Sequence, residues 1–561
     1  MNNLRSNFDP GSTRWAVRRA QWLAMGIAEE DFLKPKIAVV NSSSALSVCY
    51  QHLDHLSGLA QAAIRAAGGL PFEIHTVAPS DFVTSAGLKA RYLMPTRDLL
   101  VNDVEVMVEG SCLDGMLFLS SCDKTTPAHL MAAARLNLPS ICVPCGYQLG
   151  GSCGGREVDI EEVYKGVGGV AVGSITLAEL TNWTRCAIQG PGVCAGLATA
   201  NSMHCLAEAL GMALPGTTPI RAGSKRLEAV VAMAGKRVVE LVESDLRPRE
   251  ILTPAAFANA ASVAVAIGAS VNTMRHLAAI ATEAELAVDV TALFEEKARV
   301  LPLIAQIRPN GSHRIEDLDA AGGTRAVMVS LRPHLELTAR GVSGRPLGEL
   351  LREAPPADER VIRPLTAPFR SDPGLIILRG NLAPHGAVVK LSAMPADLRE
   401  FEGPARIFED EDQAIAELSR RTIAPGSVVV LRMMGPLGGP GTVFACSFMA
   451  AIVGAGLSDR VAVVTDGELS GLNRGITIGQ VMPEAARGGP LAVVHDGDRI
   501  RIDLVTRRID LQISAGELVA RMSAWQRPTR NLRPGWLSLY AQLVQPIEEG
   551  AVLGARRETD R

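Results

Sequence analysis

The sequence predicts an α/β fold with two domains: an amino-terminal α/β domain built on a parallel sheet, and a smaller β-rich domain at the carboxyl end. Short apolar runs alternate with helix-like segments over about the first 150 residues, a pattern typical of a parallel sheet covered by helices. After residue 366 the pattern changes to short β-type runs separated by Gly, Pro and Asp. The 561 residues also exceed a single domain, which usually has about 100 to 200.

Four apolar runs in the amino-terminal half are predicted to be buried strands. A helix-like lead-in covers residues 1–34, and a segment with helical periodicity at 52–67 follows the first run. Each run ends in a loop, and open α/β sheets bind their ligands at the carboxyl ends of their strands. The four runs are 36–40, 72–77, 115–120 and 140–145.

Residues 155–350 are predicted to be mostly helical, and a polar segment with several prolines follows them. We therefore place the first domain at 1–352, a linker at 353–366 and the second domain at 367–561. The β-type runs of the second domain are 375–378, 387–390, 427–431, 461–464, 500–504 and 509–513.

The composition is that of an ordinary soluble protein, for which we expect a cytoplasmic location. Apolar residues make up 47% and charged residues 20%, and the net charge of −3 favours neither nucleic acid nor an anionic membrane as a partner. No apolar run approaches the roughly 20 residues of a membrane span, and charged residues stand where a signal peptide has its apolar centre. The ten cysteines are then expected to be reduced, some of them as metal ligands.

The stretch 121–127 combines a thiol, a carboxylate and an amine at a predicted strand end. Cys122, Asp123 and Lys124 precede a helix-like run in which Pro127 stands near the start. Taken singly, each has an ordinary structural explanation, since a lone Cys is usually a small buried hydrophobe and Asp or Lys at a helix start often only caps it or extends to solvent. Together they indicate a site.

Cys49, Cys122 and Cys194 each stand in a loop next to a predicted strand or helix. Three cysteine thiolates can hold an iron–sulfur cluster and leave one iron open to a substrate oxygen. Three buried thiols without a cluster are the alternative. The Cys142-Val-Pro-Cys145 pair extends an apolar run, so we interpret it as structural rather than as a zinc or redox motif.

Two aspartates and one serine complete the candidate residues. Asp81 and Asp123 are hard oxygen ligands suited to Mg²⁺, although each alone is more often a turn residue. Ser470 lies in a tight turn after the apolar run 461–464. The turn lacks the Gly-x-Ser-x-Gly pattern, which disfavours an α/β-hydrolase.

Taken together, these stretches resemble the family of iron–sulfur dehydratases that includes dihydroxy-acid dehydratase, phosphogluconate dehydratase and the sugar-acid dehydratases. The resemblance covers nearly the whole chain, from about residue 36 to 515. The stretches that carry it are Cys122-Asp-Lys-Thr-Thr-Pro127, 194–203, 208–216, 380–384, 438–441 and 465–471.

The resemblance implies a β-barrel-like second domain with the active site between the two domains. It assigns Cys49, Cys122 and Cys194 to a 2Fe-2S cluster, because a cysteine at position 49 resembles the members with that cluster type. It assigns Asp81, Asp123 and a carbamylated Lys124 to Mg²⁺, and the role of general base to Ser470. The implied reaction removes water from a 2,3-dihydroxy acid to give a 2-keto acid.

The sequence departs from the family pattern at three points. Phe444 stands where the family usually has a metal-binding glutamate, and the next carboxylate along the chain is Asp459. Three consequences are open: the Mg²⁺ ion is held by fewer protein ligands, it is weakly bound or absent, or the reaction is altered. In addition, Glu468-Leu469 replaces a common Arg-Phe pair and His385 replaces an acidic residue, which indicates a rebuilt pocket.

Parts of the sequence resemble different branches of the family. The segment 125–128 resembles the sugar-acid branch, whereas 93–98 and 380–390 resemble the dihydroxy-acid dehydratase of branched-chain amino acid biosynthesis. We expect a sugar acid or promiscuous use, with the branched-chain enzyme as the alternative. A non-catalytic or redox-sensing iron–sulfur protein on the same scaffold is the alternative from another class. The family also implies a homodimer or homotetramer.

Overall fold

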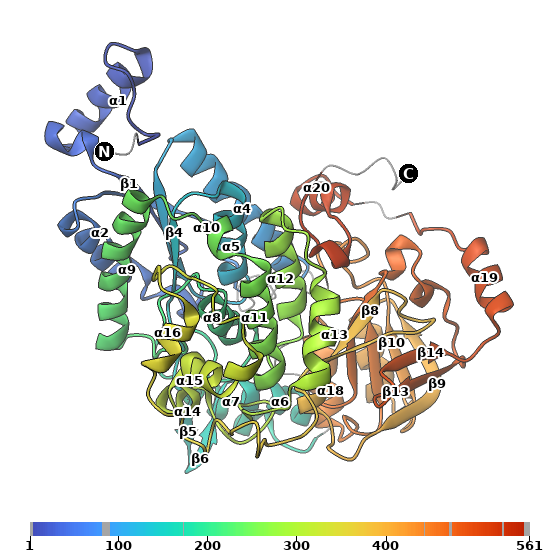
Figure 1. The fold of residues 1–561 in the computed structure, drawn as a ribbon. Helices are drawn as coiled ribbons and strands as arrows, with labels where there is room; N and C mark the ends of the chain where they lie inside the picture. Colours follow the sequence, from blue (N-terminus) through green and yellow to red (C-terminus); the bar gives the residue numbers. More distant parts are fainter. Residues whose placement is uncertain are drawn as a thin grey trace.

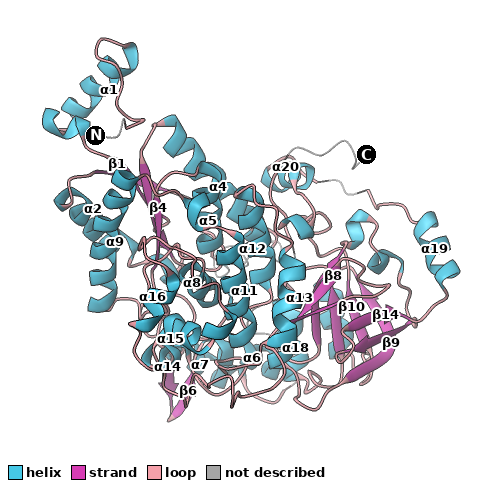
Figure 2. Ribbon diagram, viewed as in Figure 1, coloured by secondary structure: helices cyan, strands magenta, loops and turns pink. Residues whose placement is uncertain are grey.

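The computed structural model describes residues 4–80, 90–171, 173–442, 444–469, 474–529 and 532–554. Figure 1 shows a helical block that surrounds a small sheet in the amino-terminal part, and a second, larger sheet formed by the carboxyl-terminal part. Figure 2 separates the two by secondary structure: most strands belong to these two sheets, a short two-stranded hairpin lies apart from both, and helices fill most of the space between the two sheets. The predicted α/β class is confirmed.

The amino-terminal sheet has four parallel strands in the order β2-β1-β3-β4. Every residue of three of the strands is buried. Helices cover parallel sheets on both faces, and for this reason their strands are apolar throughout rather than alternating. The four predicted runs are confirmed as β1 (Lys36–Asn41), β2 (Leu70–His75), β3 (Gly115–Ser120) and β4 (Ser140–Pro144).

Helices pack on the two sides of this sheet (Figure 1). On one side, α2 (Leu53–Ala66) packs against α9 (Lys225–Ser244) and both contact strands. On the other side, α5 (Thr125–Leu136) contacts β3 and β4 and packs against α4 (Leu93–Gly110). The sheet thereby presents the carboxyl end of β3 to the interior of the molecule.

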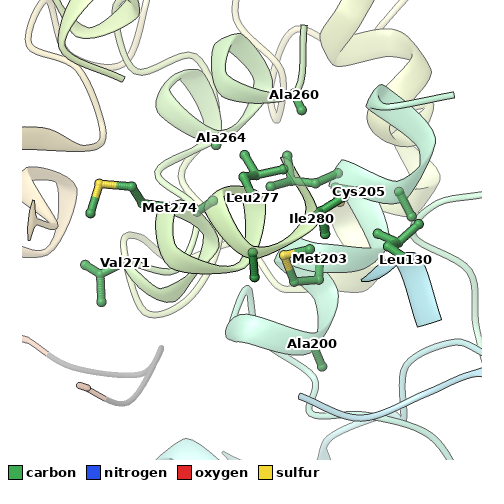
Figure 3. Packing of buried hydrophobic residues seen from close by; sticks show 14 of the residues in the cluster. Leu130, Ala200, Met203, Cys205, Ala260, Ala264, Val271, Met274, Leu277 and Ile280 are labelled. Carbon is green, nitrogen blue, oxygen red and sulfur yellow. The ribbon is translucent and has the colours of Figure 1, made fainter. Parts of the chain in front are cut away.

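Behind α5 lies a buried group of three helices. Here α12 (Asn272–Glu283) packs against α5, α8 (Thr199–Ala209) and α11 (Pro254–Ile267). Figure 3 shows the buried side chains at the centre of this packing, among them Leu130, Ala200, Met203, Cys205, Ala260, Ala264, Val271, Met274, Leu277 and Ile280. Because its middle is held in this core, the first turn of α12 has a fixed position.

The remaining elements of the first half confirm the predicted helical character of 155–350. A short hairpin interrupts it, and α1 lies at the edge of the molecule with no buried residue. Their bounds are α1 (Thr13–Ala24), β5 (Gly151–Cys153), β6 (Arg156–Val158), α6 (Ile160–Ala171), α7 (Leu177–Cys186), α10 (Pro248–Ile251), α13 (Val290–Val300), α14 (Ile315–Ala320), α15 (Gly323–Ser330) and α16 (Leu347–Arg352).

The carboxyl-terminal sheet has eight strands in the order β14-β13-β9-β10-β11-β12-β8-β7. Its four central strands are parallel and its outer strands antiparallel. A single parallel β-bridge between the backbones of Arg379, directly after β7, and Arg508 of β14 joins the two outermost strands. The sheet is therefore nearly closed and barrel-like, as the resemblance implies. The strands are β7 (Ile376–Leu378), β8 (Gly386–Val389), β9 (Glu400–Phe408), β10 (Val428–Leu431), β11 (Ala462–Thr465), β12 (Thr477–Met482), β13 (Arg499–Asp503) and β14 (Arg508–Leu511).

Six of these strands coincide with predicted runs, whereas β9 and β12 do not. β9 carries charged residues and Pro404, and Gly479 and Gln480 interrupt the apolar pattern of β12, so neither has a clear strand pattern. Helices also pack around the sheet, and the prediction of a β-rich domain did not include them. They are α17 (Glu411–Ser419), α18 (Cys446–Gly454), α19 (Ala515–Ala524) and α20 (Trp536–Leu543).

The two halves meet where α6 crosses α18. A Cβ atom added at Gly168 would lie 2.0 Å from the carbonyl oxygen of Ala450, and one at Gly454 would lie 2.1 Å from the carbonyl carbon of Gly168. Only glycine therefore allows the two helices to approach this closely. The predicted domain limits of 1–352 and 367–561 are compatible with these sheets and stay a prediction.

Across the ranges given above, no helix combines the length and the apolar character that crossing a membrane requires. All ten cysteines lie in those ranges, and none of them forms a disulfide.

Candidate active site

The turn between β3 and α5 is the centre of the candidate site. β3 ends at Ser120, and Lys124 directly precedes α5. The backbone N–H of Thr125 donates to the carbonyl of Cys122 at 3.0 Å, which closes the turn. Cys122, Asp123 and Lys124 are thus held at the carboxyl end of a strand, as predicted, and all three are at most 4% exposed.

The loop that carries Cys49 contacts this turn directly. Ser121 Oγ donates to the carbonyl oxygen of Cys49 at 2.6 Å. Cys122 Sγ lies 3.5 Å from Ser80 Oγ, which is 3.4 Å from Ser47 Oγ. Cys49 and Cys122 are both buried, and the short chain of serines brings the loops after three neighbouring strands together.

The loop that carries Cys194 joins the same place. The N–H of Gly192 donates to the carbonyl of Val48 at 3.4 Å, so this loop lies against that of Cys49. Asn201 on α8 donates to the carbonyl of Cys194 at 2.7 Å and fixes its position, and Cys194 is 7% exposed. Three soft sulfur donors from three buried loops fit the ligand set of an iron–sulfur cluster.

The Cys142–Cys145 pair of the sequence analysis is buried on β4 and directly after it. Burial raises the pKa of Cys142 to about 12 and that of Cys145 well above its ordinary value. Thiols that stay protonated are poor metal ligands and poor nucleophiles. The prediction that the Cys142–Cys145 pair is structural agrees with this.

Lys124 points into a buried cluster of charges beside the cysteine loops. Its Nζ lies 3.0 Å from Glu468 Oε2, 3.4 Å from Asp123 Oδ2 and 3.2 Å from His276 Nε2. Burial, together with the charges of Lys124 and two arginines, holds the pKa of His276 well below its ordinary value. The neutral imidazole can therefore accept a hydrogen bond from the Lys124 ammonium group.

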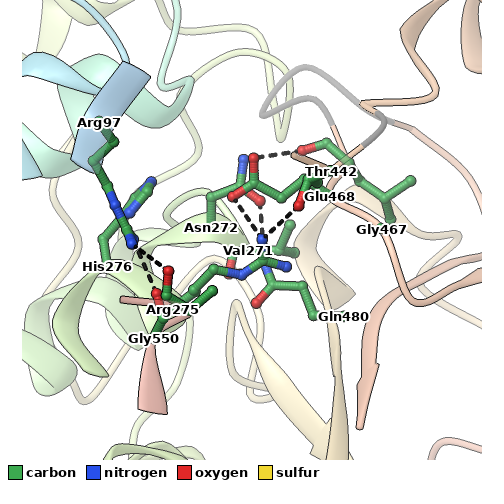
Figure 4. Close-up of polar contacts among 12 residues, drawn as sticks. Arg97, Val271, Asn272, Arg275, His276, Thr442, Gly467, Glu468, Gln480 and Gly550 are labelled. Atoms are coloured by element: carbon green, nitrogen blue, oxygen red, sulfur yellow. Dashed lines mark hydrogen bonds and ion pairs between the residues drawn. The ribbon is translucent and has the colours of Figure 1, made fainter. Parts of the chain in front are cut away.

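Glu468 is the carboxylate at the centre of this cluster. It stands in the turn after β11, is fully buried, and has its Oε1 3.4 Å from Arg275 Nη1. Burial alone would raise the pKa of this carboxyl, but the charges of Lys124 and Arg275 outweigh it, so the pKa is lowered and Glu468 is an anion. Figure 4 shows Glu468 and Arg275 in this cluster, together with Thr442 of the loop after β10.

Phe444 closes the other side of Lys124. The centroid of its ring lies 5.1 Å from Lys124 Nζ, within the range of a cation–π interaction. Phe444 is 5% exposed and packs against Ala90 and Leu93. Its ring occupies the position beside Lys124 and offers no oxygen to a metal ion.

These residues do not fit an Mg²⁺ site built on a carbamylated lysine. The ring of Phe444 offers no oxygen on one side of Lys124, and an unmodified ammonium group has N–H donors but no lone pair for a metal ion. The two carboxylates near Lys124, Asp123 and Glu468, already contact its Nζ. The described part of this site is therefore an ion-pair cluster rather than a set of oxygen ligands for Mg²⁺.

Two candidate residues, Asp81 and Ser470, lie outside the described residues. Their neighbours Ser80 and Leu469 are described. Ser80 is buried next to Cys122, and the carbonyl of Leu469 accepts a hydrogen bond of 3.1 Å from Asn272 at the start of α12.

Arg97 extends the cluster to the carboxyl-terminal segment of the chain. Its guanidinium donates to the carbonyls of Gly550 and Ala551 at 3.0 and 2.9 Å and pairs with Asp98 at 2.8 Å (Figure 4). Nothing in the sequence pattern indicated Arg97, Arg275 or His276 as site residues. Each stands on a helix among residues at ordinary helical spacing, and only the fold shows that they point to one place.

The fold and the site define a class: an α/β enzyme with a second barrel-like sheet and a buried site of cysteines, carboxylates and cations between them. Family models for the N-terminal and C-terminal parts of dihydroxy-acid/6-phosphogluconate dehydratase match residues 34–350 and 360–551. The chain belongs to this family. It is therefore a hydro-lyase, and the dehydration of dihydroxy acids expected from the sequence is the activity of its family. The family uses metal and iron–sulfur cofactors.

Several curated relatives match over almost their whole length. The chain is 42% identical over 538 residues to a dihydroxy-acid dehydratase of Methanothermobacter thermautotrophicus. The aligned residues cover 96% of this chain and 98% of the relative. It is 40% identical over 560 residues to that of Syntrophobacter fumaroxidans, with both chains covered completely. It is 41% identical over 542 residues to that of Moorella thermoacetica, with 96% and 98% covered. These names favour the alternative substrate prediction over the sugar-acid preference.

Proposed function

We propose that the protein is a dihydroxy-acid dehydratase that converts a short branched 2,3-dihydroxy acid, of the kind used in branched-chain amino acid biosynthesis, into a 2-keto acid. Relatives of this name at about 40% identity over the full chain support the proposal. The observation that carries it is the convergence of the three cysteine loops beside the buried charges of Lys124 and Glu468.

In this proposal Cys49, Cys122 and Cys194 hold a 2Fe-2S cluster. When bound, such a cluster with an open iron site supplies Lewis acidity to the C3 hydroxyl of the substrate. The protein holds the three thiols in fixed loops, through the hydrogen bonds that Ser121 and Asn201 donate to the backbone of Cys49 and Cys194. Burial of these loops also keeps water away from the reacting atoms.

Ser470 is the proposed base. It takes the C2 proton of the substrate, the C2–H electron pair forms the C2–C3 double bond, and the C3–O bond breaks so that hydroxide leaves with the electron pair of that bond. One proton, equal to the one taken from C2, converts the hydroxide to water. The resulting enol tautomerises to the 2-keto acid. A serine needs a strongly lowered pKa for this task, which nearby positive charge can supply. The hydrogen bond of Asn272 to the carbonyl of Leu469 fixes the turn that leads to Ser470.

The sequence prediction that Asp81, Asp123 and Lys124 hold Mg²⁺ enters no step of this proposal, because the described residues do not fit that ion. The positive charge next to the cluster comes from Lys124 and Arg275 instead, and both are buried. A cytoplasmic homodimer or homotetramer stays part of the proposal, and light scattering of the purified protein tests the assembly.

The test is 2-keto acid formation by cluster-replete protein under anaerobic conditions, with 2,3-dihydroxyisovalerate and a panel of aldonic acids. We expect kcat/KM for dihydroxyisovalerate to exceed that for any aldonic acid by at least tenfold. A higher kcat/KM for an aldonic acid would show that the preferred substrate is a sugar acid. No turnover of any substrate would favour the non-catalytic or redox-sensing alternative.

A further inference from the structure

Lys124 has surroundings that suit an unmodified ammonium group. Its Nζ is completely buried, with the anion Glu468 at 3.0 Å and the carboxylate of Asp123 at 3.4 Å. The electron-rich face of Phe444 lies on another side. A buried amine is stable as a cation only where opposite charge is this close, and here two carboxylates and a ring provide it.

A carbamate at the same position would meet the opposite conditions. Carbamylation turns the positive Nζ into an anionic group, which would stand against the carboxylate of Glu468 in a buried site. Without a cation between them, like charges at this distance repel strongly when water is excluded. The carbamate would also face the negative π surface of Phe444, where a cation is attracted.

Glu468 is the carboxylate that balances the positive charge of the Lys124 ammonium group. Its carboxylate binds Lys124 through one oxygen and approaches Arg275 with the other, so it links two buried cations. A carbamate with one negative charge and a bound divalent ion has the same net charge as a single ammonium group. The ammonium alone therefore leaves the site with as much positive charge as a metal-loaded carbamate would.

We propose that Lys124 remains uncarbamylated and that its ammonium group, fixed by Glu468 and Asp123 under the ring of Phe444, provides the positive charge of this subsite in place of a divalent metal ion. The inference concerns the active site of the proposed dehydratase. Its tests measure carbamylation of Lys124 and binding of a divalent ion, so they give a clear result even if the protein has no dehydratase activity.

The first test is ¹³C NMR of the full-length, cluster-bearing protein equilibrated with ¹³C-bicarbonate. The expected spectrum of the wild type has no carbamate signal beyond that of the Lys124→Gln variant, which serves as the background. A carbamate resonance in the wild type that Lys124→Gln removes would overturn the proposal. The wild-type spectrum requires no substitution, so the result does not depend on how a variant folds.

The second test is an Mn²⁺ titration followed by electron paramagnetic resonance, because Mn²⁺ reports on Mg²⁺ sites. The wild type and Lys124→Gln are expected to leave the signal of free Mn²⁺ equally unchanged. Phe444→Glu replaces the ring by an oxygen donor beside Lys124 and is expected to bind Mn²⁺ at least tenfold more tightly than the wild type. Stoichiometric binding by the wild type, or equal affinity of the wild type and Phe444→Glu, would contradict the proposal.

Discussion

At the scale of single residues, the position of a charge decides what the site can do. The residue at 444 is a phenylalanine, whereas a carboxylate from another turn, Glu468, reaches Lys124. Burial without a partner would make each of these charges costly. The ion pairs of Lys124, Glu468 and Arg275 therefore stabilise one another, and the loss of one member leaves the others unpaired.

Glu468→Gln tests this coupling. The change leaves Lys124 and Arg275 buried with one anion fewer, so we expect a loss of about 3 kcal/mol in the free energy of unfolding. Chemical denaturation measures it. Glu353→Gln, which removes one exposed partner of Arg345, is the matched control and should leave the unfolding midpoint unchanged. Equal stability of Glu468→Gln and the wild type would contradict a structural role for the ion pair.

A second prediction at this scale concerns Glu484, which holds the loop after β10. Its carboxylate accepts hydrogen bonds of 3.0 and 3.1 Å from the N–H groups of Gly438 and Leu437. Burial, with the nearby charge of Asp466, raises the pKa of Glu484 from 4.5 to about 7. Because the folded-state value is the higher one, this group's contribution to stability is fully present below pH 4.5 and lost as the pH rises through 7.

The Glu484→Gln variant does not titrate at this position. Between pH 4.5 and 7, the wild type should lose roughly 3 kcal/mol of stability relative to this variant. Urea unfolding of both proteins at the two pH values gives the difference. A constant difference across this range would show that Glu484 is ionised in the folded protein at all of these pH values.

At the scale of elements, glycines set the distance between the two halves. The helices α6 and α18 touch through Gly168 and Gly454, where an added Cβ would lie about 2 Å from backbone atoms of the other helix. Such a contact requires the helices to move apart. The barrel-like sheet and the helical block then lose part of their common packing.

Gly454→Ala is therefore expected to lower the free energy of unfolding by about 1–3 kcal/mol. Gly58→Ala in α2 is the matched control, because no atom lies within 4 Å of its added Cβ. Alanine has the higher helix propensity, so the control should gain about 0.5–1 kcal/mol. A similar gain for both variants, measured by thermal unfolding, would exclude a tight helix contact.

The three cysteine loops give the other prediction at this scale. Cys49→Ser, Cys122→Ser and Cys194→Ser should each lose most of the iron and of the visible absorbance of the reconstituted protein, because each removes one sulfur ligand. Cys142→Ser is the control and should keep both, since burial keeps that thiol protonated. Loss of iron in Cys142→Ser but not in Cys122→Ser would assign the cluster to other residues.

At the scale of the whole molecule, the apolar pattern was sufficient to predict the parallel sheet and six strands of the barrel-like sheet. It was not sufficient for β9 and β12, because charges, Pro404 and Gln480 interrupt their pattern. The turn at 121–127 could be predicted as a site, since it combines a thiol, a carboxylate and an amine at a predicted strand end.

The remaining site residues depend on contacts between distant segments. Glu468 lies 344 positions from Lys124, and Arg97 is bound by backbone carbonyls more than 450 positions away. No local periodicity records such contacts, because they arise when the barrel-like sheet docks on the helical block. The sequence indicated that position 468 departs from the family pattern, but not that its carboxylate reaches Lys124.

The most direct test of the central claim is anaerobic product formation by the wild type and by Cys122→Ser, both treated identically for cluster assembly. The account predicts 2-keto acid from 2,3-dihydroxyisovalerate with the wild type, and at least a thousandfold lower rate with Cys122→Ser. A wild type that carries its full cluster and forms no 2-keto acid would contradict the account, as would a variant that retains the wild-type rate.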